Sequence, residues 1–247
     1  MSSNVEQVQR VGKQREAFED ARKPRVHQDR NYVPPALDRL AREEVSKLVQ
    51  RVFLLPENGA RPHVVVFTGF ENNDGSSILC ARAGEALAGE VSGKVCLLDA
   101  NLTSPTLHQL YGLQNLRGLA DARREPHSAN DFVSQLAASN LWLIPAGLLG
   151  REGNRVVCSE RFQALVVGLR QQYEYLLINA PPAGLSSEVV MLGKMSDGVV
   201  LVVKAHSTRR ETLKKAKEDF DDANVRLLGA VLNQRTFPIP EAVYRRL

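Results

Sequence analysis

The sequence predicts an α/β fold that is doubly wound, with a mostly parallel sheet and helices on both of its faces. Apolar runs of strand length alternate with helical patterns along most of the chain. Several runs, such as residues 199–203, are apolar at every position, which indicates strands that helices bury on both faces. The chain has 247 residues, enough for one large domain without a second core.

The expected strands and helices follow one another in regular order. Strands are expected at 63–68, 94–99, 141–145, 175–179, 198–204 and 226–233. Helices are expected at 76–89, 159–172, 188–194 and 208–223. A further amphipathic helix is expected at 37–55, before the first strand, because its apolar residues recur at helical spacing.

The polarity of the N-terminal segment predicts the domain organisation. Residues 1–36 are rich in Gln, Arg, Glu and Asp, so we expect a flexible polar arm, with a short helix around 8–22. Residues 37–247 then form a single domain. No apolar run approaches the roughly 20 residues that a membrane helix needs, and the polar N-terminus does not resemble a signal peptide. We therefore expect a cytoplasmic protein.

Composition excludes several classes of site. Hydrophobic residues make up 43% of the chain and charged residues 24%, as in ordinary globular proteins. Cys80, Cys96 and Cys158 are far apart and form no CxxC pair, which favours buried, reduced thiols over a redox or metal site. The five histidines are equally dispersed, so no zinc site is expected. The net charge of +4 identifies no partner.

A glycine-containing loop follows the first expected strand and opens a helix. It runs Gly69-Phe70-Glu71-Asn72-Asn73-Asp74-Gly75-Ser76-Ser77. The backbone N–H groups of such a loop can bind a phosphate, and the helix dipole assists them. A functional P-loop has a lysine where this chain has Ser76 and a Mg²⁺-binding hydroxyl at Ser77. The Gly-Ser-Ser turn by itself favours a plain helix cap, but its place after a buried strand favours a phosphate loop.

Two other expected strands end in polar side chains. Asn179 ends the apolar run 175–178, at the point where a phosphate-handling enzyme is expected to place an aspartate beside Mg²⁺. Asparagine keeps the shape and an oxygen but supplies no negative charge. The second strand ends at Asp99, and Asn101 follows it.

Several motifs in a fixed order carry a family resemblance. An Asp-x-Asp-x-x-x-Pro motif with a following Leu-His is matched, apart from one aspartate, by Asp99, Asn101, Pro105, Leu107 and His108. Segments 140–147, 159–182, 197–211 and 229–233 follow in similar order and spacing. Over about residues 40–247 the chain resembles the cytoplasmic domain of the bacterial tyrosine kinases (BY-kinases) of exopolysaccharide and capsule assembly. That family belongs to the P-loop group of cell-division-site and partition ATPases, so the resemblance implies a P-loop NTPase-like fold.

The chain departs from this family at the positions that carry its chemistry. The resemblance places the P-loop lysine at Ser76, the second aspartate of the acidic motif at Asn101, and the magnesium-positioning aspartate at Asn179. Asp99 remains as a vestige of the catalytic set. The C-terminal tyrosine cluster, the family's usual phosphorylation target, is reduced to Tyr244.

The resemblance also implies a set of ligand-binding residues. For the nucleotide these are Gly69, Asp74, Gly75, Ser76, Ser77 and Asn233. Asn233 would face the adenine, and Ser77 and Asp99 are the remaining metal ligands. We expect either weak, Mg²⁺-independent binding of ATP or ADP or an empty pocket.

Phosphoryl transfer depends almost wholly on positioning and charge stabilisation, so the loss of three charges would remove useful turnover. We expect a non-catalytic relative that binds a membrane chain-length regulator or kinase-activator protein and modulates exopolysaccharide synthesis or export. That partner would hold it at the inner membrane. One alternative is an active ATP-dependent protein-tyrosine autokinase with unusual ligands. Another is a partition-type protein that positions DNA or cell poles.

Two surface features bear on assembly and on nucleic acid. The family's Glu-x-x-Arg-x-x-Arg motif for ring assembly is replaced by Glu43, Ser46 and Val49. A homo-oligomer therefore remains possible, but the chain lacks the motif that the family uses to assemble one. A basic stretch is formed by Arg209, Arg210, Lys214, Lys215 and Lys217. Such a stretch can hold DNA, but nearby acidic residues favour a solvated helix face.

Overall fold

The structure, a computed structural model, describes residues 25–26, 39–56, 60–123, 132–136, 140–148, 156–157, 159–205 and 207–234. The expected helix at 8–22, Cys158, Tyr244 and the tail after residue 234 lie outside these residues. The boundary between the arm and the domain stays a prediction. Among the described residues, no helix combines the length and the apolar character that a membrane crossing requires.

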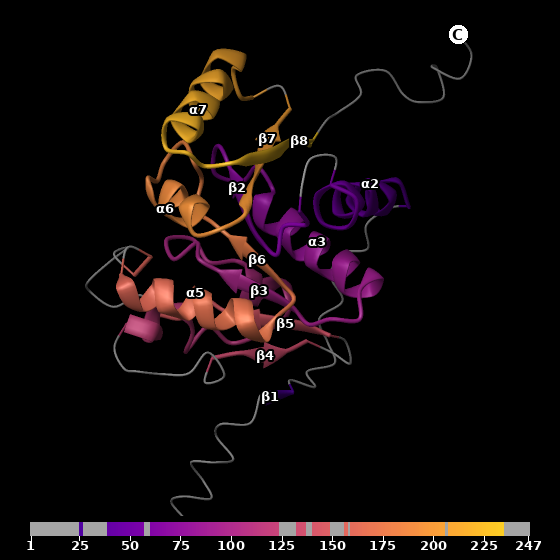
Figure 1. The fold of residues 1–247 in the computed structure, drawn as a ribbon, viewed down its shortest axis with the longest axis vertical. Coiled ribbons are helices and arrows are strands. Elements are labelled where there is room, and N and C mark those ends of the chain that lie inside the picture. The colour runs from indigo at the N-terminus through magenta and orange to yellow at the C-terminus, as the bar shows by residue number, and fades with distance from the viewer. Residues whose placement is uncertain are drawn as a thin grey trace, which may run out of the picture.

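An eight-stranded sheet forms the centre of the molecule, in the order β1-β4-β5-β3-β6-β2-β7-β8 (Figure 1). Its strands are β1 (Arg25–Val26), β2 (Val64–Gly69), β3 (Val95–Asp99), β4 (Ser134–Gln135), β5 (Leu141–Ile144), β6 (Tyr175–Asn179), β7 (Gly198–Lys204) and β8 (Leu227–Asn233). The six strands from β5 to β8 in this order are mutually parallel, whereas β4 is antiparallel to β5. The predicted mostly parallel, doubly wound fold is confirmed.

Helices cover both faces of the sheet (Figure 1). The α-helices are α2 (Arg39–Val49), α3 (Ser76–Glu90), α4 (Leu107–Leu110), α5 (Glu160–Gln172), α6 (Glu188–Lys194) and α7 (Arg210–Asp222). One core cluster joins the sheet to α5, α6 and the end of α7, and the other joins it to α2 and α3. In β2, Val64 and Val66 face the first cluster, and Val65 and Phe67 face the second. This alternation explains why the strand is apolar at each of these four positions.

The first helix differs from the expectation for 37–55. The α-helix ends at Val49, and a π-helix, η1 (Gln50–Leu54), continues it. The wider turn closes when the N–H of Leu55 donates to the carbonyl oxygen of Gln50 over 2.7 Å. Val52 and Phe53 are buried in this turn, so the switch keeps both side chains in the core. Hydrophobic spacing alone does not separate the two helix types.

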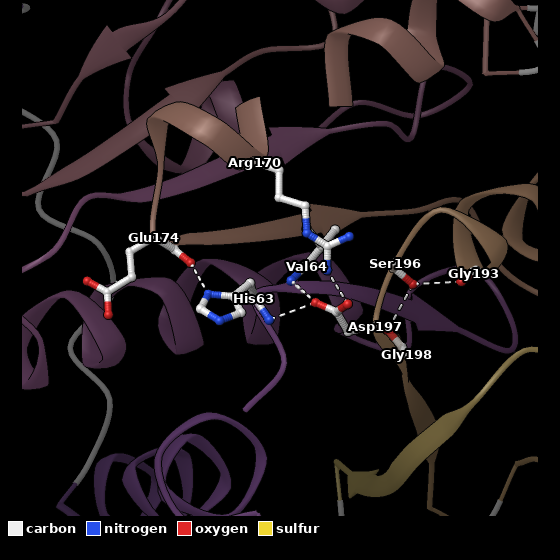
Figure 2. A network of polar contacts seen from close by, with 8 residues as sticks. All are labelled: His63, Val64, Arg170, Glu174, Gly193, Ser196, Asp197 and Gly198. Carbon is white, nitrogen blue, oxygen red and sulfur yellow. Dashed lines mark hydrogen bonds and ion pairs between the residues drawn. The ribbon is translucent and has the colours of Figure 1, made fainter. Parts of the chain in front are cut away.

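A polar network fastens the sheet at the edge where β2 and β7 begin (Figure 2). Asp197 Oδ2 accepts hydrogen bonds from the N–H groups of His63 and Val64 over 2.7 and 2.8 Å. Its other oxygen pairs with the guanidinium of Arg170 from α5. His63 Nδ1 lies 2.8 Å from the carbonyl oxygen of Glu174, just before β6. The carboxyl ends of these parallel strands lie at the opposite end of the sheet, away from this network.

Candidate functional site

The predicted site residues gather at the carboxyl ends of three neighbouring strands. β3 ends at Asp99, β6 at Asn179 and β2 at Gly69, and the sheet order places β6 between the other two. The loop after β2 leads into α3 at Ser76. The structure therefore brings the phosphate-type loop and both polar strand ends to one edge, where ligands bind in open α/β sheets.

A cleft of about 840 Å³ opens at this edge, within the range of small-molecule sites. It is lined by residues 71–78, by parts of 101–110 and 181–186, and by Gln234. Among the described residues that line it, the charged ones are Glu71 and Asp74, and none is Lys or Arg. Ser76 and Ser77 both line the cleft. The cleft is thus acidic at the place where a phosphate-binding site is basic.

The carboxylate of Asp74 turns into its own loop. Its Oδ1 accepts a hydrogen bond from the N–H of Ser76 over 3.0 Å, and its Oδ2 accepts one from the N–H of Glu71 over 3.2 Å. Asp74 is only 2% exposed. A Cβ at Gly69 would lie 1.6 Å from Oδ2, so the carboxylate occupies space that exists because Gly69 has no side chain. These N–H groups are the type of donor that a P-loop offers to a phosphate.

The end of β8 holds this loop in place. Asn233 Nδ2 donates to the carbonyl oxygen of Asp74 over 2.8 Å, and Gln234 Nε2 donates to that of Asn73 over 3.0 Å. Asn73 and Gly75 have φ angles of 60° and 86°, and a Cβ at Gly75 would lie 2.3 Å from Asn233 Nδ2. The side chain of Asn233 thus packs on the loop, and its role toward adenine stays a prediction.

Asp99 is fully buried and its oxygens are engaged. Oδ1 accepts from Asn179 Nδ2 over 2.8 Å and from the N–H of Asn101 over 3.3 Å. Oδ2 accepts from the N–H groups of Thr106 and Leu107 over 3.1 and 3.0 Å. A carboxylate offers about four acceptor sites, so these four donors leave none for a metal ion. Asp99 acts here as a cap for the loop that follows β3.

Burial raises the pKa of Asp99 from 3.8 to about 6, and the hydrogen bonds from Asn179 and the three backbone N–H groups limit the rise. The cost of taking the charged carboxylate out of water outweighs the donors that stabilise it. Asn179 is also fully buried, and its Oδ1 has no hydrogen-bond partner among the described residues. The pair therefore combines a carboxyl group of raised pKa with one amide oxygen that has no hydrogen-bond partner among the described residues.

Asn101 and Thr106 complete the wall of the cleft. Asn101 Oδ1 accepts from the N–H of Ser104 over 3.2 Å, so its amide closes a local turn instead of reaching outward. Thr106 Oγ1 is buried and has no hydrogen-bond partner among the described residues. Sequence reasoning did not name Thr106, Glu71 or Gln234 as site residues. Glu71 lies in the predicted loop and Thr106 between Pro105 and Leu107 of the acidic motif, at positions to which neither pattern assigns a role, and Gln234 follows the segment 229–233.

A magnesium-bound polyphosphate does not fit these residues. It needs cations for its phosphates and free carboxylate oxygens for its metal. The described lining supplies no cation, and the oxygens of Asp99 and Asp74 already accept hydrogen bonds. Within the described ranges, no group of three or more His, Cys, Asp or Glu residues is placed to hold a metal ion. The metal role predicted for Asp99 therefore has no support from the geometry, and that of Ser77, which lines the cleft, stays a prediction.

No family model matches the chain, but several proteins of known sequence do. The tyrosine-protein kinase YwqD of Bacillus subtilis strain 168 is 27% identical over 169 residues, which is 68% of this chain and 71% of YwqD. The tyrosine-protein kinase CpsD of Streptococcus agalactiae is 21% identical over 72% of this chain and 77% of CpsD. The tyrosine-protein kinase wzc of Salmonella typhi is 24% identical over 70% of this chain, a match that spans 24% of wzc.

Solved structures agree in fold. The kinase domain of the Escherichia coli tyrosine kinase ETK has a TM-score of 0.73 at 18% identity, covering 87% of this chain and 88% of that one. The chimerical protein CapA2B2 has a TM-score of 0.72 at 22% identity, with coverages of 79% and 85%. The septum site-determining protein MinD of Pyrococcus horikoshii, complexed with Mg-ADP, has a TM-score of 0.57 at 21% identity, with coverages of 74% and 75%. The chain is thus a relative of the bacterial tyrosine-protein kinases, and it has the fold of the P-loop ATPases.

Proposed function

We propose that this chain is a non-catalytic relative of the polysaccharide-assembly tyrosine autokinases. It binds a membrane chain-length regulator or kinase-activator protein and modulates exopolysaccharide synthesis or export. It works in the cytoplasm and reaches the inner membrane through that partner. The engagement of all acceptor sites of Asp99 by four protein donors carries the proposal, because it leaves no oxygen of Asp99 for a catalytic metal.

The missing charges support the same proposal. Removing one stabilising group from an active site costs roughly a hundred- to thousandfold in rate. Here Ser76, Asn101 and Asn179 lack three charges that the kinase family uses, and such losses abolish turnover even when they are not additive. The fold around these positions is retained, with β2, β3 and β6 side by side. A retained scaffold without these charges supports a binding role over a catalytic one.

The two alternative functions find less support. An active autokinase would need a cation at the phosphates, and the described cleft lining contains none. A partition-type DNA-binding protein would need free basic side chains on α7. Lys214 lies 3.8 Å from Glu218, and Lys217 pairs with Asp221, so acidic neighbours neutralise part of that helix. This favours a solvated face over a DNA surface.

Deletion of the gene in its own organism tests the proposed role. The amount and the chain length of the exported polysaccharide would be measured with and without the chain, and again after its reintroduction. We expect the deletion to change polymer length and the reintroduced chain to restore it. A deletion that leaves both the amount and the length of the polymer unchanged would contradict the proposal.

A further inference from the structure

We propose that Asp74 is a built-in substitute for phosphate and that it excludes phosphate-bearing ligands from the cleft. The proposal deepens the non-catalytic part of the proposed function, but it depends on no partner and on no polysaccharide. Of the two expectations for the nucleotide, weak binding or an empty pocket, the proposal favours the empty pocket: the cleft binds neither ATP nor ADP.

The position of the carboxylate carries the argument. Both of its oxygens accept hydrogen bonds from loop N–H groups, those of Ser76 and Glu71. The group is buried, and it lies where Gly69 leaves room above the end of β2. A phosphate that used these donors would have to displace the carboxylate first.

Displacement is unfavourable for two physical reasons. A buried carboxylate that loses its donors bears the desolvation penalty of an unpaired charge. Helix α3 begins at Ser76, and the positive end of its dipole stabilises a negative group at this place. The Asp74 carboxylate already occupies that position. Any phosphate that remained would face Asp74 at close range, and like charges repel.

Contacts from neighbouring residues hold the loop that carries the Asp74 carboxylate in its observed conformation. Asn233 and Gln234 hold the loop backbone on either side of the turn. Glu71, the other acid of the lining, is itself held by Ser207 Oγ, which donates to it over 3.0 Å. The described cleft lining holds no cation to offset these two acids. Exclusion therefore extends to inorganic phosphate, to free nucleotides and to their magnesium complexes.

Calorimetric titration of the full chain with pyrophosphate, and separately with ADP, tests the proposal in EDTA. The unmodified chain is expected to show no binding at millimolar ligand. Asp74→Ala frees two N–H donors and removes the charge, so its affinity should rise by at least about tenfold. Asp74→Asn keeps the shape and an acceptor for Ser76 but loses the charge, and it should show a smaller gain.

A matched control variant distinguishes the local effect of the Asp74 carboxylate from the general effect of removing one negative charge from the chain. Asp121 also accepts a loop N–H, that of Gly118 over 2.9 Å, and it does not line the cleft. Asp121→Ala removes the same charge and should leave pyrophosphate binding undetectable. An equal gain in Asp121→Ala would overturn the proposal, as would tight pyrophosphate binding by the unmodified chain.

The folded state of each variant would be checked by circular dichroism. A folded Asp74→Ala chain that still ignores pyrophosphate would also overturn the proposal. Should Asp74→Ala fail to fold, Asp74→Asn decides the question, and the absence of any gain in that variant overturns the proposal. None of these outcomes depends on the polysaccharide phenotype, so a failure of the proposed function and a failure of this inference are distinguishable.

Discussion

Asn179 donates a hydrogen bond from Nδ2 to Oδ1 of Asp99 over 2.8 Å, across the neighbouring ends of β6 and β3. The resemblance to the kinases implies an aspartate beside a metal ion at the position of Asn179. Here the amide of Asn179 replaces both the second negative charge and the metal ion, because it donates a hydrogen bond to the remaining carboxylate, that of Asp99. The contact converts a pair that would need a cation into a pair that is stable without one.

The raised pKa of Asp99 predicts a particular dependence of stability on pH. Between about pH 4 and pH 6 the folded state keeps a proton that the unfolded state releases, so the free energy of unfolding falls as pH rises through this window. Asp99→Asn should remove this dependence, which is worth about 3 kcal/mol at most. Urea unfolding at pH 4 and pH 7 measures it. The exposed control Asp222→Asn should keep the slope of the unmodified chain, and an Asp99→Asn chain with that same slope would contradict the account.

Asn179→Asp should be tolerated only when one of the two carboxylates is protonated. Two ionised carboxylates within hydrogen-bond distance repel each other, which raises the pKa of the pair. We expect a loss of melting temperature that is large at pH 8 and small at pH 4. Asn224→Asp adds the same charge at an exposed position and should lose little at either pH. Equal losses for Asn179→Asp at the two pH values would show that the contact with Asp99 is not the reason.

Asp197 should stabilise the opposite edge of the sheet. Its partial burial by itself would raise its pKa, but the N–H groups of Val64 and His63 and the guanidinium of Arg170 outweigh burial and lower the pKa below its usual value. Its stabilising effect is therefore present above about pH 4 and is lost as the pH falls below that. Asp197→Ala should lower the free energy of unfolding at pH 7 by about 1–3 kcal/mol, since the N–H of buried Val64 and that of exposed His63 lose their acceptor. A cost equal to that of Asp222→Ala would contradict this role.

Two glycines of α3 form a matched pair for testing how this helix packs on the sheet. A Cβ at Gly84 would lie 2.7 Å from Leu97 Cδ2, whereas nothing lies within 4 Å of one at Gly89. Gly84→Ala should cost about 1–3 kcal/mol by overpacking, and Gly89→Ala should stabilise by about 0.5–1 kcal/mol through helix propensity. Thermal or urea unfolding distinguishes them. Similar effects at the two positions would mean that α3 does not approach β3 this closely.

The main elements were predictable because their apolar runs are sharply bounded. β6, α6 and β7 have the expected limits, since Pro181 interrupts the pattern after β6, and Ser196 and Asp197 separate α6 from β7. β4 was missed because two residues show no period, and the π-helix η1 was missed because its hydrophobic spacing resembles that of an α-helix.

The candidate site was predictable in location and not in detail. Strand ends placed Asp99 and Asn179 at one edge, as found. The direction of the Asp74 carboxylate was not predictable, because it depends on the missing side chain of Gly69 and on contacts from β8, which lies far away in the sequence. The nucleotide-binding role of Asp74 stays a prediction, and its carboxylate accepts the N–H groups of Glu71 and Ser76 in the structure.

Incubation of the purified full chain with radiolabelled ATP and Mg²⁺ tests the central claim most directly. Without a cation at the phosphates and without a free acidic ligand for the metal, the chain should form no phosphotyrosine and release no phosphate above the buffer control. A related active kinase, assayed in parallel, provides the positive control. Phosphotyrosine that forms at a rate comparable to that kinase, and that disappears in a folded Asp99→Ala variant, would contradict the account.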